Sequence, residues 1–132
     1  MTASPNRLWG TIVGAAYILV GMLGFTVTGD VDFFATEGGL FLGLFEVNVF
    51  QNVAHILIGS ALLLAAFSNP RAARTVNTTV GVGFLLLGFA GLLLVGSPFN
   101  FLALNAADNV VHLGSAVILL AVGLGADRPS AA

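Results

Sequence analysis

The chain has 132 residues, of which 58% are hydrophobic and only 8% are charged, and it contains four arginines but no lysine or cysteine. About a quarter of the residues in a soluble domain are charged, so this composition excludes a soluble globular domain and predicts one integral membrane domain over residues 1–132. The missing cysteines exclude disulfides and thiolate metal sites, and four dispersed arginines exclude nucleic-acid binding.

The first apolar run, residues 8–28, follows Arg7 and contains no charged residue. A helix needs roughly 20 apolar residues to cross a bilayer, so this run predicts the first membrane span. A secretory signal has a shorter apolar run that is followed by an Ala-x-Ala cleavage site, and no such site follows here. We therefore expect the span to be retained.

The segment that follows carries Asp30, Asp32 and Glu37 and then an apolar string, residues 40–45. Acidic side chains belong in water, whereas the apolar string suits the headgroup region of a bilayer. We expect an interfacial segment that leads into a second span over residues 45–67. This span ends before Pro70, because proline cannot continue a helix.

Residues 76–95 and 102–125 are the third and fourth expected spans. Four spans place all the arginines on one side of the membrane and most of the acids on the other: Arg7, Arg71, Arg74 and Arg128 against Asp30, Asp32, Glu37 and Glu46. The positive-inside rule then predicts a multi-pass protein of the cell membrane with both termini in the cytoplasm.

The two halves of the chain, residues 8–67 and 75–125, repeat one pattern. Three glycines of the first span recur in the third span at a constant offset of 67 residues: Gly14, Gly21 and Gly24 against Gly81, Gly88 and Gly91. We therefore predict an all-α four-helix transmembrane bundle built from two tandem helical hairpins that run parallel to each other, related by an axis along the membrane normal. Small residues at such spacing favour close helix packing.

Polar residues interrupt the second and fourth spans in two matching stripes. The first stripe consists of Asn48, Gln51, Asn52 and His55, and the second of Asn105, Asp108, Asn109 and His112. In each stripe the two asparagines and the histidine are spaced i, i+4 and i+7, so they share one helix face. At ~1.5 Å per residue both histidines lie roughly 15 Å deep, near the middle of the bilayer. Polar groups at this depth are costly and indicate a functional site.

These residues, together with Gly59 and Gly114, resemble the pattern of small four-helix membrane proteins grouped as domain of unknown function 4383. The resemblance covers most of the chain and implies the four-span architecture, with no established activity. Members of that family often have histidine where this chain has Gln51.

Three functions are compatible with the stripes. In the first, the stripes hydrogen-bond to each other and hold spans two and four together at the centre of the bundle, in a structural or accessory subunit whose partners are the lipid bilayer and a larger membrane complex or a second copy. In the second, His55 and His112 bind a b-type haem or a metal ion. In the third, Asp108 and His112 form part of a path for protons or small solutes. We do not expect an enzyme, because no nucleophile and base are paired.

Overall fold

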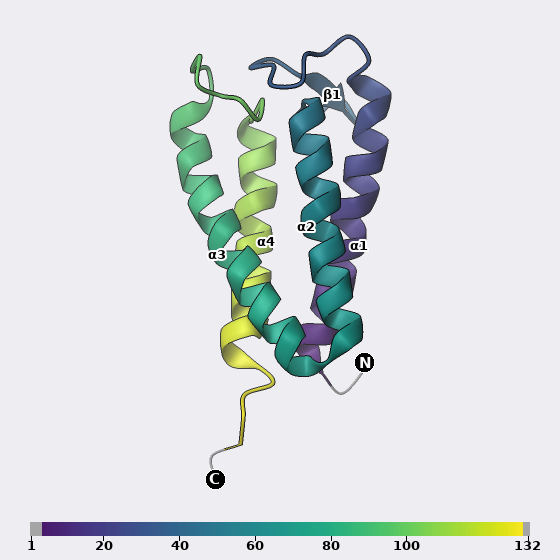
Figure 1. Cartoon of the computed structure of the whole chain (residues 1–132). Helices are drawn as coiled ribbons and strands as arrows, with labels where there is room; N and C mark the ends of the chain where they lie inside the picture. Colours follow the sequence, from purple (N-terminus) through teal and green to yellow (C-terminus); the bar gives the residue numbers. More distant parts are fainter. Residues whose placement is uncertain (1–3, 131–132) are drawn as a thin grey trace.

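The computed structural model describes residues 4–130 and consists of four long helices joined by short connections (Figure 1). The helices are α1 (Pro5–Gly24, extended by the 3-10 turn η1, Phe25–Val27), α2 (Val49–Ser68), α3 (Pro70–Leu94) and α4 (Ala106–Gly125). Each of them is long and apolar enough to cross a membrane. Two short strands, β1 (Gly39–Phe41) and β2 (Phe45–Val47), form a small hairpin in the connection between α1 and α2.

The helices pack in tandem pairs, α1 with α2 and α3 with α4. The two hairpins stand side by side in the same orientation, so that the α1–α2 and α3–α4 connections share one end of the bundle. We call this the loop end. Both chain termini and the α2–α3 turn lie at the other end, the terminal end (Figure 1). The predicted bundle of two tandem hairpins is therefore confirmed.

The second helix begins later than the expected start at residue 45. Residues 45–47 instead pair with β1 as strand β2, with Phe41 opposite Phe45 and Gly39 opposite Val47. The turn between the strands uses Leu42 and Gly43 at positive φ. Asn48 then starts α2, because its side chain accepts a hydrogen bond from the backbone N–H of Gln51 and so caps the first turn. The fourth helix likewise begins after the expected residue 102, behind the cap Asn105.

The third helix begins earlier than the expected residue 76. Pro70 does follow the end of α2, as predicted, but it also occupies the first turn of α3, with Asn69 as the cap. Proline is favoured there because the first-turn N–H groups have no partner within the helix. Arg71 and Arg74 therefore belong to α3 rather than to a connecting loop.

The glycines allow close packing within each hairpin. A Cβ atom on Gly14 would lie 2.8 Å from the carbonyl oxygen of Gly59, and one on Gly24 would overlap the side chain of Asn52. In the second hairpin a Cβ on Gly91 would overlap Asn109 in the same way. The matching glycines of the repeat therefore have matching neighbours.

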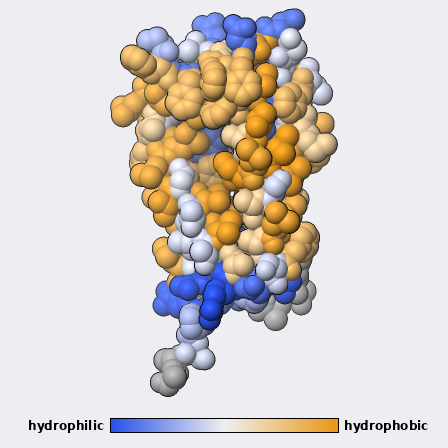
Figure 2. Space-filling model, viewed as in Figure 1, coloured by the Kyte–Doolittle hydropathy of each residue, from blue (hydrophilic) through white to orange (hydrophobic). Residues whose placement is uncertain are grey.

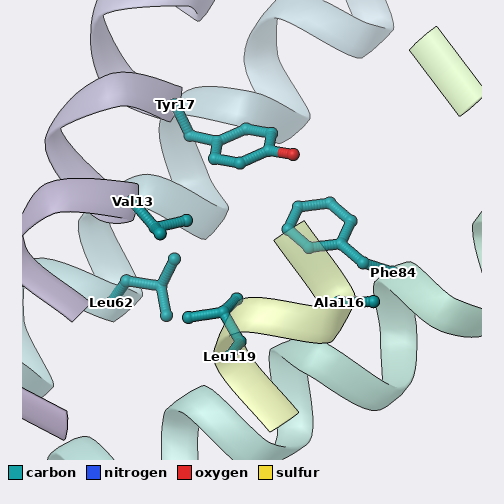
Figure 3. Close-up of a cluster of buried hydrophobic side chains, with 6 residues drawn as sticks. All are labelled: Val13, Tyr17, Leu62, Phe84, Ala116 and Leu119. Carbon is teal, nitrogen blue, oxygen red and sulfur yellow. The ribbon is translucent and has the colours of Figure 1, made fainter. Parts of the chain in front are cut away.

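The face of the molecule in Figure 2 is apolar between two polar ends, and exposed apolar side chains lie on the outer faces of all four helices. Exposed side chains on these faces include Leu64, Leu86, Leu93, Val110 and Val117. The buried core is small, and Figure 3 shows its members where the four helices converge: Val13, Tyr17, Leu62, Phe84, Ala116 and Leu119. Apolar surface of this extent around a whole bundle matches a lipid environment.

Candidate functional site

His55 and His112 meet inside the bundle, one from each hairpin. Their Nε2 atoms lie 3.4 Å apart, a long hydrogen bond, and only 6% and 2% of their surfaces are exposed. In a bond between neutral imidazoles, one ring donates its Nε2–H and the other accepts, so the accepting ring carries its proton on Nδ1. Neither Nδ1 has a protein partner among the described residues. The pair therefore retains one unused donor and one unused acceptor.

Two aromatic rings enclose the histidines. Tyr17 contacts His55 edge-on at a centroid distance of 5.1 Å, and Phe84 stacks on His112 at 5.3 Å. Tyr17 and Phe84 also stack on each other at 4.8 Å. Tyr17 and Phe84 occupy equivalent positions of the repeat. Each hairpin therefore contributes one aromatic ring and one imidazole to a single cluster.

Asn48 and Asn105 lie at the loop end, where each caps its helix and also reaches across to the other hairpin. The Nδ2 atom of Asn48 donates to the carbonyl oxygens of Ala35 and, in the second hairpin, of Phe101, at 2.9 and 2.7 Å. The Nδ2 atom of Asn105 donates to the carbonyl of Leu44 in the first hairpin at 2.9 Å. These two asparagines therefore join the hairpins reciprocally.

Of the other stripe residues, Asn52 and Asp108 have hydrogen-bond partners within their own hairpins. Asn52 donates to the hydroxyl of Thr28 within its own hairpin, and Asp108 accepts from the backbone N–H of Asn105 in a capping box. The side chains of Gln51 and Asn109 are buried without a protein partner among the described residues. Among the described residues, the hydrogen bond that joins the two stripes to each other is the one between the histidines.

Helices α2 and α4 do not pack along each other, contrary to the prediction from the sequence. Helix α2 has more extensive contact with α1 and α3 than with α4. The reason is that the glycines allow α1 to pack closely on α2 and α3 on α4. The two helices that carry the stripes, α2 and α4, therefore contact each other through long side chains.

A third polar contact joins the hairpins at the terminal end, and the sequence analysis did not identify it. The Nδ2 atom of Asn6 donates to the carbonyl of Val122 and to the carboxylate of Asp127, and Ser4 donates to the same carboxylate. Asn77 in turn donates to the carbonyl of Asn6 at 2.9 Å. The signal for this contact in the sequence is that Asn6 and Asn77 are single amide side chains at the start of apolar runs.

Asp127 lies just beyond α4, outside the membrane-spanning segments. Partial burial alone would raise the pKa of its carboxyl group, but the hydrogen bonds from Asn6 and Ser4, with the nearby charge of Arg74, hold that pKa below its ordinary value.

Two arginines at the terminal end bind the last turns of the neighbouring helices. The Nε atom of Arg7 donates to the carbonyl of Ala66 at the end of α2, and that of Arg74 to the carbonyl of Gly123 at the end of α4. Each places a positive charge where the helix dipole is negative. The offset of 67 residues relates the two arginines, so this contact belongs to the repeat as well.

A cavity of about 310 Å³ lies between α1 and α4, beside the histidines. Its walls are mainly apolar, and its polar side chains are Tyr17, His55, Asp108, His112 and Ser115. The hydroxyl groups of Tyr17 and Ser115 are 2.8 Å apart.

The site does not fit a haem or a structural metal ion. A macrocycle has to lie between the two Nε2 atoms, and the rings of Tyr17 and Phe84 pack directly against both imidazoles. No group of three metal-binding side chains occurs within residues 4–130, and a zinc site needs at least three protein ligands.

A transport path through one copy is also not supported. Between the histidines and the terminal end, the centre of the bundle is filled by Leu62 and Leu119, both fully buried (Figure 3). Asp108 lies on the loop-end side of the histidines, so it does not continue the path toward the terminal end.

A family model described as Domain of unknown function (DUF4383) matches residues 7–125. No curated protein and no solved structure matches the chain.

Proposed function

We propose that this chain, which belongs to the family described as Domain of unknown function (DUF4383), is a structural or accessory subunit of the cell membrane. In this proposal the two polar stripes serve to fix one hairpin against the other. The observation that carries the proposal is the presence of hydrogen bonds between the hairpins at the loop end, in the middle and at the terminal end of the bundle.

Hydrogen bonds suit this purpose because lipid tails compete with apolar side chains for the helix surfaces. Association in a bilayer depends on close packing and on polar contacts, each of which contributes about 0.6 to 2 kcal/mol. Glycine packing provides the first kind of contact within each hairpin. The histidine pair and the asparagines provide the second kind between hairpins.

The charge distribution supports an orientation with both termini in the cytoplasm. All four arginines belong to the terminal end, where three of them donate to backbone carbonyls near helix ends. The loop end carries the acids of the α1–α2 connection and an aromatic cluster of Phe33, Phe34, Phe50 and Phe101. Apolar side chains of this kind suit the boundary between the lipid headgroups and the hydrocarbon.

The partners we propose are the lipid bilayer and either a larger membrane complex or a second copy of this chain. The apolar outer faces are compatible with each of them. Purification in a mild detergent, with mass measurement and identification of retained proteins, distinguishes a complex from a homo-oligomer. A chain that stays monomeric and alone under all mild conditions would contradict the accessory role.

The structural role of the stripes is tested by His55→Ala, His112→Ala and the double variant. We expect each single variant to lower the free energy of unfolding by about 1 to 2 kcal/mol, and the double variant to lower it by less than the sum, because both remove the same contact. Leu57→Ala, on the lipid-facing side of α2, is the matched control. Histidine variants as stable as the control would contradict the proposal.

A further inference from the structure

The cavity between α1 and α4 has the form of a slot that opens sideways toward the lipid. Along α1 its wall runs from Trp9 to Val20, which at ~1.5 Å per residue is about 16 Å. At its mouth, Ile12 and Ile118 line the cavity while 47% and 38% of their surfaces stay exposed. A molecule dissolved in the bilayer could therefore enter without crossing the polar ends.

The inner wall of the slot offers hydrogen bonds that the protein does not use. The hydroxyls of Tyr17 and Ser115 bond to each other, and since one of them donates, the proton of the other is free for a ligand. The rings of His55 and His112 line the same cavity and are more than nine-tenths buried. Polar atoms in an apolar site normally have partners, so the free hydroxyl proton points to a ligand that accepts it.

The charge of the slot restricts the ligand. Among the described residues that line it there is no arginine and one acid, Asp108, near the loop end. A carboxylate or phosphate headgroup would thus meet no positive partner, and the desolvation of its charge would be uncompensated. The depth of the histidines also places the polar wall far from the headgroups of ordinary lipids. The ligand is therefore neutral and able to reach the middle of the bilayer.

We propose that the slot binds a neutral, lipid-soluble ring that carries carbonyl or hydroxyl oxygens and an apolar chain, which is the chemistry of a membrane quinone. The volume of about 310 Å³ lies at the lower end of the range for small-molecule sites. It holds the ring and the first part of the chain, and the remaining chain leaves through the mouth between Ile12 and Ile118. This inference goes beyond the structural role and does not depend on it.

Trp9 provides the assay, because it is the only tryptophan of the chain and it lines the slot. The full chain in lipid nanodiscs is titrated with a naphthoquinone that carries a decyl chain, and the quenching of tryptophan fluorescence is recorded. We expect saturable quenching. Quenching that rises linearly with the amount of quinone in the lipid, without saturation, would overturn the proposal.

Ala16→Leu tests whether the slot is the site. Ala16 lines the cavity and is exposed, so the larger side chain fills the mouth with little effect on the core, and we expect the Kd to rise at least tenfold. Leu19→Phe adds the same number of carbon atoms on the lipid-facing side of α1 and should leave the Kd unchanged. Val111→Phe narrows the slot from the opposite wall, and it serves as the test variant if Ala16→Leu does not fold. Equal affinities of all variants would refute the assignment.

Tyr17→Phe combined with Ser115→Ala tests the hydrogen-bonding wall, because either hydroxyl alone would keep a proton free for the ligand. Loss of one hydrogen bond typically weakens binding about fivefold, and we expect this effect for the quinone but not for a decyl-substituted benzene without oxygen. Competition distinguishes other occupants: decane or decanoate that displaces the quinone at equal concentration would show a site for acyl chains and overturn the proposal.

Discussion

Gly59→Ala tests whether helix contact at the glycines holds the first hairpin together. The added Cβ would lie 2.6 Å from the carbonyl oxygen of Gly14 and 2.8 Å from the backbone nitrogen of Ile18. Both are backbone atoms of α1, so no side-chain rotation relieves the contact and the helices must separate. Overpacking of this kind costs about 1 to 3 kcal/mol.

Gly114→Ala is the matched control, because a Cβ at this exposed position of α4 meets no atom within 4 Å. It should raise stability by up to about 1 kcal/mol, the difference in helix propensity between alanine and glycine. Gly59→Ala gains the same helix propensity, so the two variants should differ by the overpacking cost alone, about 1 to 3 kcal/mol in the free energy of unfolding, measured by titration with a denaturing detergent and circular dichroism. Equal stability of the two variants would refute the reasoning.

Two further predictions concern the ends of the bundle. Asn48→Ala should lower the free energy of unfolding more than Asn105→Ala. Asn48 is fully buried and its loss removes a helix cap and two other hydrogen bonds, whereas Asn105 is half-buried and its loss removes a cap and one other hydrogen bond. Chemical unfolding of both variants checks this order, and the reverse order would contradict the prediction. The lowered pKa of Asp127 means that its carboxylate stabilises the fold above the ordinary pKa of about 3.9, and that this contribution is lost as pH falls through the lower folded-state value. Asp127→Asn should therefore lower Tm at neutral pH and reduce the loss of Tm on acidification, and an unchanged pH profile would contradict this.

The sequence predicts the four spans, the two hairpins and the family because these depend on composition and on repeated spacing. It also predicts that Asn52 and His55 share a buried face, since both lie within one helix. It does not predict which helix that face meets. The partner depends on how closely the glycines bring α1 to α2, and that distance is a property of the packed bundle.

The helix starts were predictable in principle. Asn48, Asn69 and Asn105 each precede the first turn of a helix, and Asn105 with Asp108 forms a capping box that is readable from the sequence. The hydropathy pattern obscures the capping role of Asn48 and Asn105, because it favours a polar stripe inside a membrane span at these positions. The contact of Asn6 with Asp127 joins residues at opposite ends of the chain, and local spacing carries no information about such a pair.

The two hairpins meet through their histidines inside the membrane, and this contact can be measured directly. The chain has only two histidines, so labelling with ¹⁵N-histidine gives signals from this pair alone. Solid-state NMR of the labelled protein in liposomes should show a ¹⁵N–¹⁵N correlation between the Nε2 atoms of His55 and His112, whose separation is 3.4 Å. Two imidazoles with no correlation between their rings would contradict the account.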